Sequence, residues 1–168
     1  MRLALTGTPG TGKTTVSERL NVDLDIVHLG DVIGQEDLVT ERDEVRETDV
    51  VDIEGLIAAT ADMDDVIFES HLSHHLPVDR VIVLRCAPEE LTERLRSRTE
   101  SARSISENAE GEALDLILSE AVASHGRDAV YEIDTTDRAL DSVVAEVEAA
   151  IAGEIEPAAS VVDFTDYL

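Results

Sequence analysis

The chain has 168 residues, a net charge of −25 from 38 acidic and 13 basic side chains, and one cysteine. This length suits one hydrophobic core and argues against two independent domains. The single cysteine, Cys86, excludes an internal disulfide and a four-cysteine zinc site, and we interpret it as a core residue. No apolar run reaches the roughly 18 residues of a membrane helix, so we expect a cytoplasmic protein without a membrane span.

The acidic residues are spread along the whole sequence rather than gathered in a tail. An acidic surface with very little lysine and few aromatics is typical of proteins that work in molar salt, which screens their self-repulsion. A surface that binds basic partners is the alternative. Because affinity for phosphate backbones comes mainly from Lys and Arg, we expect no direct nucleic-acid binding.

Short apolar runs alternate with longer amphipathic stretches, the pattern of strand–helix–strand units. Strands are predicted at residues 3–5, 25–28, 65–69, 80–85 and 129–134. Helices are predicted at residues 13–20, 53–61, 88–98, 107–123 and 140–151. The sequence therefore predicts an α/β fold with a five-stranded parallel sheet and helices on both faces. A ligand should bind beyond the carboxyl ends of the strands.

The predicted domain covers residues 1–153, and the acidic residues 154–168 form a tail. This tail contains Phe164 and Tyr167, although the chain has only two Phe and two Tyr. Two outcomes stay open: the aromatic residues dock the tail on the domain, or the tail stands apart from it.

A phosphate-binding motif follows the first predicted strand. Residues 7–15 are GTPGTGKTT and satisfy G-x-x-x-x-G-K-[ST], whose backbone N–H groups surround phosphates. A chance glycine-rich turn is the alternative, but the strand before the motif and the helix after it favour a P-loop. We expect ATP with Mg²⁺ here, bound by Gly10, Gly12, Lys13, Thr14 and Thr15, with Lys13 at the phosphates and Thr14 at the metal.

Lys13 is the only lysine in the chain, which uses arginine twelve times. A compact ammonium fits inside a closed loop of backbone N–H groups, whereas a planar guanidinium is larger. A GTPase would need a second lysine in the N-K-x-D motif that recognises guanine. The larger P-loop motor proteins need a longer chain. The small kinases are the P-loop class that fits this sequence.

Four blocks in order carry a resemblance to a known family: GTPGTGKTT, LGDVIGQEDL…RDE…VVDIEGL, VIFESHLSHHLPVDRVIVLR and LTERLRSRTESARSISENAEGEALD. Together they extend to about residue 151. They resemble the archaeal and eukaryotic adenylate kinases of the nuclear, ribosome-maturation type, the coilin-interacting nuclear ATPase family.

This resemblance implies a nucleoside monophosphate kinase that converts ATP and AMP to two ADP, with a short lid and an accompanying ATPase activity. It also implies a role in late maturation of the small ribosomal subunit and its 16S rRNA, with transient binding to a small-subunit platform protein. Two alternatives stay open: an assembly ATPase with incidental kinase activity, and another P-loop small-molecule kinase.

The resemblance also implies a role for particular segments of the chain. Residues 30–53 correspond to the monophosphate-binding segment and residues 99–109 to the lid. Arg98 at the edge of the lid is expected to contact ATP as a catalytic residue. Asp134 and Thr135, with Thr136 after them, are expected beside the adenine.

Two positions depart from the family pattern. Gly34 stands where relatives carry an arginine that holds the monophosphate, so either Arg42 or Arg46 substitutes, or the monophosphate binds weakly. Ser104 stands where a lysine is typical, so closure of the lid would depend on Arg98 and Arg103.

The strand at 65–69 ends in Glu69, two residues before His71. Because relatives place D-x-H here, Glu69 is expected to be the Walker B carboxylate, holding Mg²⁺ through water, with His71 as its catalytic companion. A solvated glutamate at a strand end is the alternative.

We expect His74 and His75 on the loop surface rather than in a zinc site, and Arg94 in an ion pair with Glu90.

Overall fold

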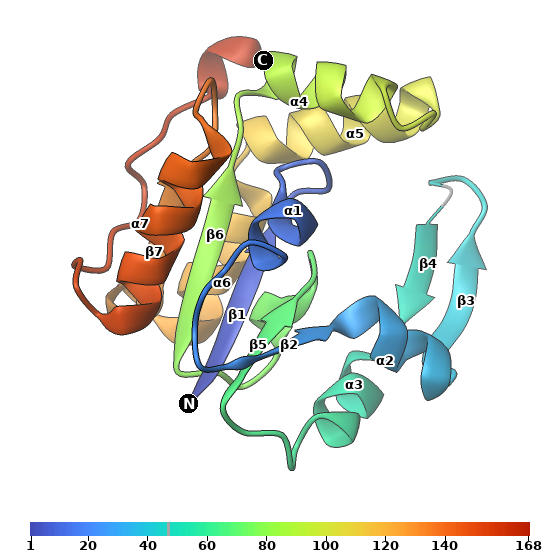
Figure 1. The fold of residues 1–168 in the computed structure, drawn as a ribbon. Coiled ribbons are helices and arrows are strands. Elements are labelled where there is room, and N and C mark those ends of the chain that lie inside the picture. The colour runs from blue at the N-terminus through green and yellow to red at the C-terminus, as the bar shows by residue number, and fades with distance from the viewer. Residues whose placement is uncertain (47) are drawn as a thin grey trace.

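The computed structural model describes residues 1–46 and 48–168 (Figure 1). A five-stranded sheet has the order β2-β5-β1-β6-β7, and every pairing in it is parallel. The strands are β1 (Arg2–Gly7), β2 (Asp25–His28), β5 (Val66–Glu69), β6 (Arg80–Arg85) and β7 (Val130–Asp134). These are the five predicted strands, so the predicted α/β fold with a parallel sheet is confirmed.

Helices cover both faces of the sheet because its central strands are apolar on both sides. Leu3 and Leu5 pack with α1 (Lys13–Ser17) and α7 (Leu140–Ala152) in one core cluster. Ala4, between them, packs on the other face with α6 (Leu116–His125). A third cluster joins α2 (Leu29–Gln35) and α3 (Ile53–Ala59) to β5.

The predicted helix at 107–123 is wrong in one respect, because two helices occupy this region. Helix α5 (Ala102–Ala113) ends before Asp115, and α6 starts after it. Asp115 has a left-handed backbone (φ 56°), and its carboxylate accepts a hydrogen bond from the buried Arg85. No proline or glycine stands at residues 112–118, so the sequence carried no usual signal for a helix break there. Helix α4 (Pro88–Arg96) precedes this pair.

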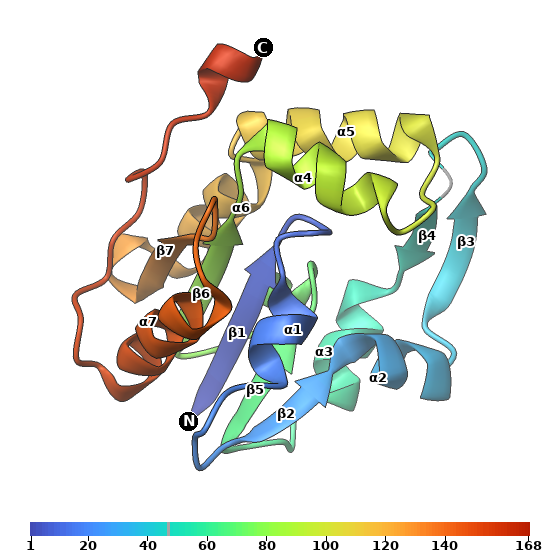
Figure 2. The same cartoon turned by 45° about the horizontal axis from the view of Figure 1, so that its top comes forward.

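The sequence prediction missed α2 and a small antiparallel hairpin. Strands β3 (Val39–Asp43) and β4 (Thr48–Val51) pair with Arg42 opposite Asp49. Figure 2 shows this hairpin on the side of the sheet away from α7. Most of its described residues are exposed, so the hairpin has no alternation of apolar and polar residues to mark it.

The tail docks on the body. Ala158 bridges Tyr131 in parallel, with backbone bonds from Glu132 N to Ala158 O (2.8 Å) and from Ala158 N to Val130 O (3.0 Å). Further along, the Phe164 ring lies 5.3 Å from the Arg85 guanidinium. The short 3-10 helices are η1 (Ser73–His75), η2 (Arg127–Ala129) and, in the tail, η3 (Thr165–Tyr167).

None of the helices described here is both long enough and apolar enough to cross a lipid bilayer.

Candidate active site

The loop between β1 and α1 needs glycine at two points. Gly7 has φ 145°, and a Cβ there would lie 2.5 Å from the Leu84 carbonyl oxygen. Gly10 has φ 93°, and a Cβ there would lie 2.8 Å from a Leu95 methyl group. Both the backbone conformation and the close packing exclude a larger residue. The loop therefore wraps tightly against β6 and α4, as a P-loop does.

Lys13 lies inside this loop and is 8% exposed. Its ammonium group donates to the carbonyl oxygens of Gly7 (2.8 Å) and Thr8 (3.2 Å). Burial lowers the pKa of Lys13 to about 8, and Arg98 contributes to the lowering, while the charge of Glu69 opposes it. A phosphate would restore a strong negative partner at this position.

Glu69 at the carboxyl end of β5 faces the start of α1. Its Oε1 is 3.5 Å from the Thr14 hydroxyl, and its Oε2 is 2.7 Å from Nδ1 of His28. The sheet register places His28 directly beside Glu69. Sequence reasoning missed His28, although a polar residue at the end of a strand next to β5 was a usable signal.

The Thr14 hydroxyl and the Glu69 carboxylate are hard oxygen donors that lie 3.5 Å apart. This donor set fits Mg²⁺, which prefers oxygen ligands and keeps several waters. The roles expected for both residues at the metal stay predictions.

A cavity of about 320 Å³ lies on one side of the P-loop, and we call it the narrow cavity. Three arginines line it, on α4, after α4 and before α7: Arg94, Arg98 and Arg138. Thr135, Gly10, Gly12 and Thr15 also line it. The predicted nucleotide residues Arg98, Thr135 and Thr15 thus come together in one cavity.

Two residues in this region have additional roles. Arg94 forms the expected ion pair with Glu90, and it also approaches the Thr11 carbonyl oxygen (3.3 Å) and the Thr135 carbonyl oxygen (3.2 Å). The Asp134 carboxylate accepts from the backbone N–H (2.9 Å) and hydroxyl (2.6 Å) of Thr136, and Asp134 is not among the residues lining either cavity.

A larger cavity of about 1340 Å³ lies on the other side of the P-loop, where Lys13 and Thr14 line it, and we call it the wide cavity. Its walls come from the P-loop, α2, the β3–β4 hairpin, the end of β5, α5 and the start of α6. Gly34, Ser104 and His71 line it, and so does Arg42, the only arginine among its described lining residues. Arg46 pairs with Asp43 (3.9 Å), and Arg103 pairs with Glu107 (3.0 Å); neither lines a cavity.

The three histidines after β5 have different environments. His71 is exposed to the wide cavity, where desolvation by its surroundings and then the charge of Lys13 lower its pKa to about 4. His75 is half-buried. The expectation that His74 lies on the loop surface is wrong, because this side chain is 1% exposed and its Nδ1 bonds the Thr6 hydroxyl (2.9 Å).

A buried charge network lies behind the P-loop, and sequence reasoning missed it. Arg85 pairs with Glu112 (2.8 Å), Glu132 (2.6 Å) and Asp115. Glu112 in turn accepts a hydrogen bond from the Thr8 hydroxyl of the P-loop (2.5 Å). The network therefore connects α5 and β7 to the phosphate loop.

Cys86, next to Arg85, is fully buried as expected, and burial raises its pKa to about 12.

A P-loop at the carboxyl ends of a 2-5-1-6-7 parallel sheet defines the P-loop kinase fold. A shikimate kinase from Bacteroides thetaiotaomicron has the same fold, with a TM-score of 0.58 and 19% identity over 90% of this chain and 98% of that one. A family model described as "AAA domain" matches residues 3–115.

Archaeal sequences give closer matches. A Natronomonas pharaonis protein is 54% identical over the full length of both chains, and one from Halobacterium salinarum is 52% identical, also over both full lengths. A Methanocaldococcus jannaschii protein is 38% identical over 99% of this chain and 94% of its own. All three carry the name "Putative adenylate kinase". The chain belongs to this archaeal family of AAA-domain proteins.

Proposed function

We propose that this protein is a nucleoside monophosphate kinase that transfers a phosphoryl group from ATP to AMP. The observation that carries the proposal is that the P-loop lies between two cavities: Gly10, Gly12 and Thr15 line the narrow cavity, and Lys13 and Thr14 line the wide cavity. A kinase needs two nucleotide sites that meet at the transferred phosphoryl group, and a cavity on each side of the P-loop supports this reading. The names of the archaeal relatives support the same reaction.

ATP would occupy the narrow cavity, with its phosphates on the P-loop. Thr135 lies where the base would bind, and Arg98 lies at the cavity edge, where its charge can stabilise the transferring phosphoryl group. Bound Mg²⁺ would neutralise charge on the phosphates, held by Thr14 and, through water, by Glu69. His28 orients Glu69 by the bond between Nδ1 and Oε2.

The acceptor nucleotide would occupy the wide cavity, which residues of the 30–53 segment line on one side. We assign its phosphate to Arg42 rather than Arg46. Arg42 lines the cavity, whereas Arg46 is paired with Asp43 on the hairpin. Residues 99–109, the proposed lid, span the α4–α5 turn and the start of α5, and Ser104 faces the same cavity. His71 would remain neutral near pH 7 and contact the transferring group without adding charge.

Several finer features belong to the same proposal. They include an accompanying ATPase activity, a role in late maturation of the small ribosomal subunit through a platform protein, a cytoplasmic location, and a 1–153 kinase domain. A surface adapted to molar salt is also part of it, supported by the net charge of −25. These features rest on composition and on the family resemblance.

ATP hydrolysis without a nucleotide acceptor is the second candidate function. The glycine at position 34 and the volume of the wide cavity favour it, because both weaken the hold on a monophosphate and admit water.

A coupled assay separates the two functions. Purified protein in molar KCl receives Mg·ATP with AMP, CMP, UMP or GMP, and the formation of nucleoside diphosphate and of free phosphate is followed separately. The kinase proposal predicts diphosphate formation with at least AMP. Free phosphate alone, at a rate that no monophosphate changes, would establish the hydrolase instead.

A further inference from the structure

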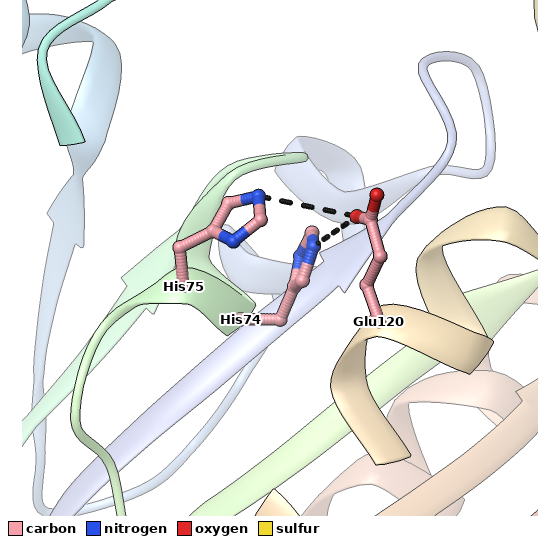
Figure 3. Close-up of side chains that lie close together, drawn as sticks. All are labelled: His74, His75 and Glu120. Carbon is pink, nitrogen blue, oxygen red and sulfur yellow. Dashed lines mark hydrogen bonds and ion pairs between the residues drawn. The ribbon is translucent and has the colours of Figure 1, made fainter. Parts of the chain in front are cut away.

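A cluster of two imidazoles and one carboxylate lies outside both cavities. His74 and His75 come from η1, and Glu120 comes from α6 on the face of the sheet that α6 covers. Figure 3 shows both rings directing a nitrogen toward the same carboxylate. One ligand atom from each residue lies within 4.8 Å of the others. None of the three residues lines the proposed nucleotide sites.

The distances in the cluster suit a small metal ion. Oε2 of Glu120 is 2.8 Å from Nε2 of His74 and 3.9 Å from Nε2 of His75. In a tetrahedral zinc site with bonds of about 2.0–2.1 Å, neighbouring ligand atoms are about 3.3 Å apart. The two observed distances lie on either side of that value, so small side-chain rotations would bring the atoms to bonding geometry.

His74 is already oriented as a metal ligand. Its ring is 1% exposed, and Nδ1 bonds the Thr6 hydroxyl (2.9 Å), which leaves Nε2 to face the cluster. In the metal-free protein Nε2–H donates to Oε2 of Glu120 (2.8 Å), and Nδ1 accepts from the Thr6 hydroxyl. With a metal ion on Nε2, the ring proton would sit on Nδ1 and donate to the Thr6 hydroxyl oxygen. Such bonds from the second nitrogen fix the tautomer in most histidine metal sites.

The cluster supplies one carboxylate to balance the charge of a cation, and it leaves space for a solvent ligand. The side chains of His75 and Glu120 are 32% and 53% exposed, so water can reach a fourth position. His125 also lies nearby, but its Nε2 bonds the His74 carbonyl oxygen (2.7 Å). This ring therefore holds the backbone of η1 and is not counted among the metal ligands.

We propose that His74, His75 and Glu120 form a binding site for one divalent transition-metal ion of the Zn²⁺ class, with water as the fourth ligand. Two imidazole nitrogens and one carboxylate suit Zn²⁺ and disfavour Mg²⁺, which requires oxygen ligands. The ion would connect η1 to α6. Because η1 follows the β5 segment that carries Glu69 and His71, the ion would stabilise the back of the active site without contacting nucleotide.

Zinc titration tests this site directly. Full-length protein is freed of metals with a chelator, dialysed into KCl buffer at pH 7.5, and titrated with Zn²⁺ by calorimetry without nucleotide. The variants are Glu120→Gln and His75→Gln, both at partly exposed positions. Glu93→Gln, an exposed acid on α4, is the control that removes the same charge elsewhere. Circular dichroism checks that each variant is folded.

The proposal predicts one equivalent of Zn²⁺ bound by the wild type and by Glu93→Gln, with a raised melting temperature. Both cluster variants should bind at least about tenfold more weakly, as expected when a ligand is lost. Co²⁺ should give the visible absorption of a four-coordinate site in the wild type and in Glu93→Gln, but not in the two cluster variants. Equal zinc affinity in all four proteins, or no zinc binding by the wild type, would overturn the site and leave a simple hydrogen bond between His74 and Glu120.

Discussion

The two cavities beside the P-loop are built in different ways. The narrow cavity is lined by three arginines, and its P-loop is held from behind by the Thr8–Glu112–Arg85 network. The wide cavity is about four times larger, and its outer wall is a hairpin whose described residues are mostly exposed. Only Arg42 brings a guanidinium into it from the residues described.

This difference indicates how the two proposed substrates are bound. The donor side is rich in positive charge, and its P-loop is held by buried hydrogen bonds, so we expect little ordering when ATP binds. The acceptor side depends on one arginine on a small hairpin, so its affinity and specificity should be more sensitive to single changes.

The largest effect is expected from Lys13→Met. Lys13 is buried at the P-loop and lines the wide cavity, and loss of its ammonium should remove stabilisation of the phosphoryl oxygens in the transition state. We expect kcat to fall at least about a hundredfold, the usual cost of losing one such donor. Steady-state ADP formation measures this, with the melting temperature as the check on folding. An unchanged kcat would remove Lys13 from the mechanism.

The next largest effect is expected from Glu112→Gln, which weakens the buried charge network behind the P-loop. Glu112 accepts from Arg85, from the Cys86 N–H and from the Thr8 hydroxyl, all in a buried setting. We expect unfolding free energy to fall by about 2 kcal/mol, as for a buried charge-assisted bond, and the KM for ATP to rise. Urea unfolding measures the first effect. Glu110→Gln, an exposed acid on the same helix, is the control; equal losses in both variants would contradict the role of the network.

A smaller effect is expected from Arg42→Ala, which changes the wide cavity. Losing one charge-assisted contact to phosphate should raise the KM for AMP about tenfold and leave the KM for ATP unchanged. Arg46→Ala is the matched control on the same hairpin, and neither KM should change in it. Initial rates at varied AMP measure both variants. If Arg46→Ala has the larger effect on AMP, the assignment of the phosphate to Arg42 is wrong.

The smallest effect is expected in the pH dependence of kcat/KM for ATP. Burial lowers the pKa of Lys13 to about 8, so the charged form predominates below that pH and is lost above it. For free enzyme, kcat/KM for ATP should fall about tenfold for each pH unit well above 8. Bound phosphates raise the pKa of the lysine, so kcat should decline only at higher pH. A flat kcat/KM profile up to pH 10 would contradict the depressed pKa.

The sheet and the P-loop could be predicted from the sequence because their signals are local. Runs such as RVIVLR are apolar on both sides, and GTPGTGKTT combines its glycines and lysine in nine residues. The hairpin could not be predicted, because VTERD and TDVV lie on the surface and show no periodic apolar residues.

Long-range side-chain contacts account for the other differences. The bond between Thr8 and Glu112 joins residues 104 positions apart, and the bond between Thr6 and His74 joins residues 68 positions apart. No local pattern encodes such pairs. The burial of His74 follows from its contact with β1 and α6, whereas its neighbours in the sequence suggested a surface loop.

If the two cavities hold a phosphoryl donor and a nucleotide acceptor, the protein must transfer phosphate to AMP. Mg·ATP is incubated with radiolabelled AMP in molar KCl, and the products are separated by chromatography. Label should pass from AMP to ADP, with little free phosphate, and Lys13→Met should abolish the transfer. Label that stays in AMP while ATP is converted to ADP and phosphate would show that the wide cavity does not hold a nucleotide acceptor.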